Sequence, residues 1–358
     1  MNWLQRHIRP EQIRELILLV VIIVTVIIFG SLIPNYYSDR TFNRIASSVS
    51  IITVVAVGQT LVVLTRSIDL SVGSIVGATA FVVGLVLLNN HDISPVLAVA
   101  MAMAMGAVMG AVNGVIVAWG RVPPIITTLG TLAIYRGILV VTFGGEVVTT
   151  DKLPKWLIDF PTLGLFYIGN IEVRALVGVA VAVVIVFHLA TSYLNFGRQI
   201  YAIGSNPDAA ELIGLPKNRV ILTVFTLSGA LSGLAGFLFL GRFGDVTVQA
   251  GNGLELQSVA AVVVGAVNIF GGSGTVLGAL LGASVIGILS QSLLRLPISE
   301  FWQEAVLGFL ILAAVASDAI ILGRLRALWA RGELKLIAKP ASVTTLTLPN
   351  RPEEVVSR

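Results

Sequence analysis

Long apolar runs, each comparable in length to a membrane-spanning helix, recur along the chain from residue 16 to residue 322. A helix needs about 20 predominantly apolar residues to cross a bilayer, and soluble domains do not repeat such runs. The runs are continuous and do not alternate every second residue, which excludes the strands of a transmembrane barrel. Only 12% of the 358 residues are charged. The sequence therefore predicts an all-α polytopic membrane protein.

We expect ten membrane-spanning helices. Their predicted ranges are 16–33, 45–65, 70–88, 93–119, 124–143, 175–191, 220–240, 255–269, 274–294 and 302–322. The third, fifth and eighth are short or interrupted by glycine and polar residues, which is typical of segments near a binding region or a pore. The apolar core of the first is longer than the roughly 7–15 residues of a signal peptide, so we interpret it as a retained helix.

The segments between the predicted helices are too short to form a second domain. We expect one membrane-spanning domain over residues 1–322, with a cytoplasmic N-terminus at 1–15 and a basic, partly disordered cytoplasmic tail at 323–358. Lys and Arg accumulate in cytoplasmic loops, and here they cluster in the N-terminus, the linker 192–219 and the tail. This distribution explains the net charge of +4 without a nucleic acid partner. It predicts that both termini and the linker are cytoplasmic and that the loop 144–174 is external.

The residues that several kinds of chemistry require are absent from this sequence. The sequence contains no Gly-x-x-x-x-Gly-Lys-Ser/Thr phosphate loop, so we expect no nucleotide site. It has no cysteine, which excludes disulfides and thiolate metal sites. Its three histidines are isolated, and the predicted helices hold no cluster of His, Asp and Glu. We therefore expect no catalytic residue, no metal and no cofactor in this chain.

An internal repeat relates the two halves. The segment 67–72 is matched by 253–259, and each places a carboxylate and a hydroxyl at the start of an apolar helix. A second pair of matched motifs is Gly110-Ala111 with Arg121-Val122-Pro123, and Gly282-Ala283 with Arg295-Leu296-Pro297. The copies lie five predicted helices apart, an odd number, so the second is inverted in the membrane. Inverted repeats are typical of transporters whose substrate path lies between the halves.

Glycine pairs spaced four residues apart occur in several of the predicted helices. They are Gly73 and Gly77, Gly106, Gly110 and Gly114, Gly229 and Gly233, and Gly278 and Gly282. This spacing puts small residues on one helix face, so that helix backbones can approach closely in lipid.

The linker contains a predicted two-turn helix from Asn206 to Gly214. Asn206 is suited to cap its start, Pro207 to occupy its first position and Asp208 to face the positive end of the helix dipole. Gly214 is suited to end it.

The apolar side of this helix is predicted to consist of Ala209, Ala210 and Ile213. So short a helix is marginal in water by itself, and an apolar face of this kind docks in the groove of a partner. The alternative is an ordinary loop helix that lies on the membrane.

Five motifs together resemble those of one transporter family. They read Leu64-Thr65-Arg66-Ser67-Ile68-Asp69-Leu70-Ser71-Val72-Gly73-Ser74, Thr128-Leu129-Gly130-Thr131 with Tyr135-Arg136-Gly137, Phe196-Gly197-Arg198-Gln199-Ile200-Tyr201-Ala202-Ile203-Gly204-Ser205-Asn206, residues 253–266 and Gly271-Gly272-Ser273-Gly274. With them the chain resembles, over about residues 45–322, the permease subunits of sugar-type ABC importers. These serve ribose, xylose, arabinose, rhamnose and the autoinducer-2 signal. Within the family the chain looks most similar to the autoinducer-2 channel subunits.

The resemblance implies a ten-helix permease of the bacterial inner membrane that pairs with a second copy or with a sister permease. It implies a cytoplasmic tandem ATPase, which binds ATP and magnesium, and a periplasmic or surface-anchored solute-binding protein. It also implies that the linker helix contacts the ATPase. The residues expected to couple to it are Asn206, Asp208, Ala209, Ala210, Glu211 and Gly214.

Polar residues inside the predicted helices are candidates for a path that carries a hydroxylated solute. They are Gln59, Asp69, Asn113, Arg136, Glu255 and Gln257. A charge at mid-bilayer costs on the order of 3 kcal/mol, so Asp69 and Arg136 need a partner or water. They are equally explained as structural residues, with Asp69 capping its helix and Arg136 paired with a carboxylate.

The function that we expect is import of a sugar or sugar-like solute (a pentose, deoxysugar, polyol or autoinducer-2) driven by a separate ATPase. The alternative is an ion-coupled secondary transporter in which Asp69 and Glu255 bind the ion. That alternative leaves the docking helix in the linker without a role.

Overall fold

The computed structural model describes residues 10–297 except 170, together with 299, 302, 305, 306, 308, 309 and 312. Within these residues eight helices are long and apolar enough to cross a membrane. They are α2 (Pro10–Leu32), α3 (Asp39–Leu64), α4 (Val72–Asn89), α5 (Pro95–Ala118), α6 (Pro124–Phe143), α8 (Ala175–Tyr193), α11 (Lys217–Phe243) and α13 (Val276–Leu293). At 1.5 Å per residue, even 18 residues extend about 27 Å, close to the roughly 30 Å hydrocarbon core. The predicted all-α polytopic fold is confirmed.

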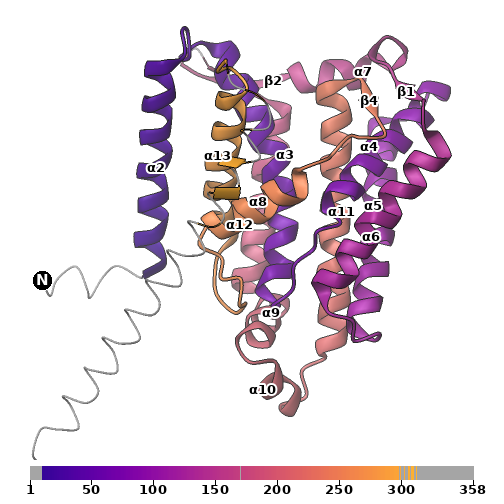
Figure 1. The fold of residues 1–358 in the computed structure, drawn as a ribbon, viewed down its shortest axis with the longest axis vertical. Helices are drawn as coiled ribbons and strands as arrows, with labels where there is room; N and C mark the ends of the chain where they lie inside the picture. The colour runs from indigo at the N-terminus through magenta and orange to yellow at the C-terminus, as the bar shows by residue number, and fades with distance from the viewer. Residues whose placement is uncertain are drawn as a thin grey trace, which may run out of the picture. The chain divides into compact units, whose positions relative to one another are not determined.

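The eighth predicted span differs from the structure in length. Instead of filling 255–269, α12 (Leu254–Val264) has 11 residues, about 16 Å at 1.5 Å per residue. The chain then leaves the helix at Gly265 and stays non-helical until α13 begins. In Figure 1, α12 lies at mid-height of the bundle. The tenth predicted span, 302–322, lies largely outside the described residues, as does the tail.

One end of the bundle carries the two helices that link α8 to α11. These are α9 (Asn195–Ser205) and α10 (Pro207–Leu212). The Tyr201 hydroxyl of α9 donates to the Gly274 carbonyl of the α12–α13 loop at 2.8 Å, and Thr275 in that loop donates to Glu15 of α2 at 3.4 Å. The start of α2 and the α12–α13 loop therefore share this end, which we call the α9–α10 end (Figure 1).

The opposite end carries short strands and turns, and we call it the strand end (Figure 1). Its elements are β1 (Val147–Val148), η1 (Thr150–Lys152), α7 (Lys155–Asp159), η2 (Phe160–Thr162), β2 (Gly164–Ile168), β3 (Ile171–Arg174) and β4 (Val246–Thr247). Strand β1 pairs antiparallel with β4, and β2 with β3. The first pairing attaches the predicted external loop 144–174 to the segment that follows α11, and the second forms a hairpin within the loop.

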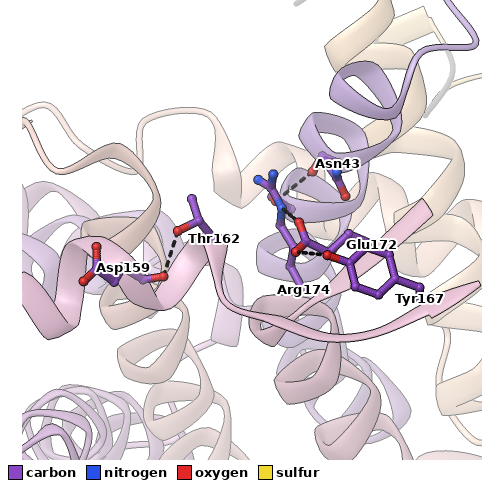
Figure 2. A network of polar contacts seen from close by, with 7 residues as sticks. Asn43, Asp159, Thr162, Tyr167, Glu172 and Arg174 are labelled. Atoms are coloured by element: carbon purple, nitrogen blue, oxygen red, sulfur yellow. Dashed lines mark hydrogen bonds and ion pairs between the residues drawn. The ribbon is translucent and has the colours of Figure 1, made fainter. Parts of the chain in front are cut away.

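Polar contacts hold the strand end together. Asp245, beyond α11, accepts from the Thr150 backbone N–H and from its hydroxyl, both at 2.8 Å. The first of these bonds, followed by the second, lowers the pKa of the Asp245 carboxyl. Figure 2 shows Tyr167 and Arg174 converging on Glu172, with the Tyr167 hydroxyl at 3.2 Å and the Arg174 Nε at 3.4 Å from its carboxylate.

Helices α3, α4 and α11 form the interior, whereas α2, α5 and α6 turn apolar side chains outward. In the most apolar 18-residue stretch of α3, 94% of the residues are buried, against 11% in α2. Glycines bring α5 close to α11: a Cβ on Gly106 would lie 2.2 Å from the Gly229 carbonyl oxygen. The predicted packing role of this spacing is confirmed for these two helices, because no side chain fits between the backbones.

The two halves of the bundle share a broken-helix pattern. Helix α3 is followed by non-helical residues 65–71 and then α4, and α11 is followed by residues 244–253, which include β4, and then α12. Arg242 in the last turn of α11 donates to the carbonyl of Arg44 in the first part of α3 at 3.3 Å. The two long helices therefore run in opposite directions, as an inverted repeat requires.

Candidate functional site

The two broken helices meet where α4 and α12 begin. A Cβ on Gly73 would lie 2.7 Å from the Gly251 carbonyl oxygen, and one on Gly77 would lie 2.1 Å from that of Ala250. Gly251 itself has φ +77°, a left-handed conformation that favours glycine. We call this contact, formed by residues 69–77 and 248–257, the half-helix junction. Transporters bind their substrates beside discontinuous helices of this kind.

Asp69 is the centre of a buried polar network on the α4 side of the junction. The side chains of Asp69 and Asn113 are fully buried. Asp69 Oδ1 accepts from the Ser71 backbone N–H at 2.9 Å and from the Ser71 hydroxyl at 2.6 Å. Asn113 Nδ2 donates to the same hydroxyl at 2.7 Å. These bonds tie the start of α4 to α5, so Asp69 is hydrogen-bonded to its own helix start, as in a cap.

Gln59 holds the same segment from the side of α3. With its amide turned to satisfy both groups, its nitrogen lies 3.0 Å from the Asp69 carbonyl oxygen and its oxygen 3.2 Å from the Asp69 nitrogen. Gln59 is also fully buried. Three of the predicted path residues therefore come together, but protein encloses them. Asp69 Oδ2 and Asn113 Oδ1 have no hydrogen-bond partner within the part of the chain that the structure describes.

Arg136, on α6, holds the other side of the junction. Its Nη1 donates to the carbonyls of Val248 and Ala250, both at 2.7 Å. Glu255 Oε1 accepts from the Gly253 backbone N–H at 3.2 Å, at the start of α12. Arg136 thus fixes the extended segment that leads into α12, through backbone carbonyls rather than through the carboxylate partner considered from the sequence.

Gln257, the last predicted path residue, lines a cavity of about 280 Å³. The cavity lies between the junction and the strand end, bounded by α3, α11 and α13. Its polar lining consists mainly of amides and hydroxyls: Ser48, Arg242, Gln249, Asn252, Gln257, Ser290 and Gln291. We call it the amide-lined cavity. Amides and hydroxyls both donate and accept hydrogen bonds, which suits a solute rich in hydroxyl groups.

Several of these lining residues are absent from the sequence-based candidates. Ser48 and Gln291 belong to different predicted spans, and Gln291 Nε2 donates to the Ser48 hydroxyl at 3.3 Å. A glutamine within an apolar helix is a detectable signal of a polar surface. Only the fold shows that these side chains face the same cavity as Gln257.

At the α9–α10 end, helix α10 has the predicted capping. The Ala209 N–H donates to Asn206 Oδ1 at 3.1 Å, and Pro207 is the first residue of the helix. Gly214 follows with φ +78°. The capped linker helix predicted from the sequence is confirmed, with six helical residues.

The predicted apolar face of α10 needs a correction. Ala210 is 3% exposed and packs into the interior of this chain, so it does not share an outward face with Ala209 and Ile213. The outward apolar side chains are Leu212, 89% exposed, and Ile213, 75% exposed. Asp208 and Glu211 are exposed as well. The physical reason is that α9 and α11 both contact α10 and bury one of its sides.

Nothing in the described part of the chain forms a metal site: no three His, Asp or Glu side chains come together there.

Known proteins resemble this chain over most of its length. Residues 41–315 match the family model described as a branched-chain amino acid transport system permease component. The "Autoinducer 2 import system permease protein LsrC" of Yersinia pseudotuberculosis serotype O:1b (strain IP 31758) is 36% identical over 313 residues, which cover 87% of this chain and 86% of that protein. The protein of the same name from Yersinia enterocolitica serotype O:8 / biotype 1B is 34% identical over 313 residues, covering 87% and 83%. No solved structure gives a significant match.

Proposed function

The chain belongs to the family of sugar-type ABC importer permeases, and we propose that it carries a sugar or sugar-like solute through the membrane for a separate ATPase. Members of this family are multi-pass transport subunits. In the proposal, ATP and magnesium bind to the cytoplasmic ATPase, a solute-binding protein delivers the solute, and a second permease completes the path.

We infer the class of solute from the side chains that line the amide-lined cavity. The family model is described for branched-chain amino acids, whereas the relatives matched over 87% of the chain are described for autoinducer 2. A carboxylate in the lining would favour the ammonium group of a zwitterionic amino acid. The described lining of the cavity contains Arg242 and no carboxylate. Its amides and hydroxyls favour a neutral, hydroxylated solute such as a pentose, deoxysugar, polyol or autoinducer-2, and in this proposal Gln257, which lines the cavity, binds it.

The same proposal assigns each end of the bundle to one side of the membrane. A cavity of about 860 Å³ at the α9–α10 end is lined by four basic side chains, Arg66, Arg121, Lys217 and Arg219, and by Glu211 as its acidic residue. Basic residues concentrate on the cytoplasmic side of membrane proteins. This supports a cytoplasmic α9–α10 end, where α2 begins, and an external strand end, while the cytoplasmic C-terminus is proposed from the basic residues of the tail alone. Helix α10 then faces the ATPase with Asp208, Ala209, Glu211, Leu212 and Ile213.

Uptake by a strain that lacks the gene tests the solute class. The strain is complemented with the wild-type chain or with Gln257→Leu and given labelled pentoses, deoxysugars, polyols, autoinducer-2 and leucine. We expect one hydroxylated solute to depend on the wild-type chain, while leucine uptake does not change. Gln257→Leu should lower that uptake about 5-fold to 10-fold, because one hydrogen bond contributes about 1 kcal/mol. A strain that loses only leucine uptake contradicts the proposed solute class.

A further inference from the structure

Arg66 joins the linker helices to the first broken helix. It lies two residues beyond α3, and its guanidinium reaches the end of α9. Arg66 Nε donates to the Gly204 carbonyl and Nη2 to the Ser205 carbonyl, both at 2.6 Å. Charge-assisted hydrogen bonds from a cation to the last carbonyls of a helix are strong and are favoured by the helix dipole.

The second broken helix reaches the same point from the other side. The Gly272 N–H, in the loop after α12, donates to the Leu64 carbonyl at 3.1 Å. A Cβ on Gly204 would lie 1.8 Å from that Leu64 oxygen and 2.6 Å from the Gly272 nitrogen. A Cβ on Gly271 would lie 2.5 Å from Arg66 Cγ. Three backbones are therefore packed together at the end of α9 with no space between them.

These contacts connect α9, the two broken helices and the half-helix junction in a closed circuit. From Arg66 the chain runs through residues 67–71 to the start of α4, which contacts residues 250–251 at the half-helix junction. From there α12 leads through the loop 265–275 back to α9, where Tyr201 donates to the Gly274 carbonyl at 2.8 Å. The end of α9 is therefore in direct contact with both broken helices.

From this geometry we infer that Arg66 is a positioning residue that transmits movement of α9 and α10 to the half-helix junction. The inference rests on the proposed function, because it is the ATPase bound at α10 that would move these helices. The guanidinium of Arg66 bonds to the end of α9, next to α10, and Arg66 is not among the residues that line the amide-lined cavity. Its role lies between them.

The backbone of Arg66 supports a specific role for its side chain. Arg66 has φ +63°, a left-handed conformation that a non-glycine residue adopts at a cost of about 1–2 kcal/mol. The two bonds to successive carbonyls come from two nitrogens of one planar fork. Lysine offers a single ammonium group and cannot reproduce that geometry.

The test compares solute transported per ATP hydrolysed in complexes of the chain with its ATPase and binding protein, reconstituted in liposomes. Arg66→Gln should insert and co-purify with the ATPase like the wild type and continue to hydrolyse ATP. We expect its ratio of solute to ATP to fall about tenfold. Arg66→Lys should fall severalfold, because the charge remains and the fork is lost.

Arg121→Gln is the matched control. Arg121 is also exposed, also left-handed at φ +54°, and lines the same cavity at the α9–α10 end. Its ratio should stay within about twofold of the wild type. If Arg66→Gln transports as much solute per ATP as the wild type, the inference is overturned. If Arg66→Gln fails to insert, a wild-type ratio of solute to ATP in Arg66→Lys overturns it instead. A failure of the proposed function is separate, since the wild-type chain would then bind no ATPase.

Discussion

Replacing Leu212 or Ile213 with glutamate is expected to separate the chain from its ATPase and to lower uptake at least tenfold. These apolar side chains, at the end of α10, are 89% and 75% exposed within the part of the chain that the structure describes. Burying one in a groove contributes about 1.5–3 kcal/mol. A carboxylate there also has to be desolvated without a partner, which costs more. Since about 1.4 kcal/mol changes a binding constant tenfold, either variant should abolish co-purification.

Asn218→Asp is the control for this experiment. It adds a carboxylate to an exposed position at the same end and removes no apolar contact. It should insert, co-purify and transport like the wild type. Ala210→Trp is a poor probe of docking, because Ala210 is buried and a larger side chain would disturb the permease itself. If both glutamate variants still co-purify and transport, α10 is an ordinary loop helix and the docking proposal fails.

Gly77→Ala is expected to have the second largest effect, by opening the half-helix junction. The added Cβ would lie 2.1 Å from the Ala250 carbonyl oxygen and 3.0 Å from Arg136 Nη1. A backbone atom cannot swing away as a side chain can, so the segment held by Arg136 has to shift. Overpacking of this kind typically costs about 1–3 kcal/mol. We expect a lower melting temperature in detergent and uptake reduced about tenfold.

Gly137→Ala, on α6 beside Arg136, is the matched variant. A Cβ on Gly137 meets nothing within 4 Å, and alanine is favoured over glycine in a helix by about 0.5–1 kcal/mol. Its melting temperature and uptake should equal or exceed those of the wild type. If the two alanine variants behave alike, close packing at the junction does not govern transport.

Features that depend on local sequence were predictable. The apolar runs predict the long helices, since length and hydrophobicity alone decide whether a segment can span a bilayer. The capped helix after Asn206 follows from its capping residues. The matched segments predict that the regions of Asp69 and Glu255 both start helices, and the structure places these starts against each other.

Features that depend on distant contacts were not predictable. The run 255–269 is interrupted by polar residues and by Gly265, but isolated interruptions of this kind do not by themselves show that α12 stops at Val264. The inward side of α10 is set by its neighbours, which is why Ala210 was placed on the wrong face. The carbonyl partners of Arg136 lie more than 100 residues away in sequence. The roles of the six predicted path residues and of the coupling residues stay predictions.

The most direct test of the account asks what drives uptake. The chain is reconstituted in liposomes, alone or with its ATPase and binding protein, and accumulation of the solute is followed with ATP, with a proton gradient or with a sodium gradient. We predict accumulation only when the ATPase, the binding protein and ATP are all present. Accumulation by the chain alone under an ion gradient would contradict the account and would favour an ion-coupled carrier that uses Asp69 and Glu255.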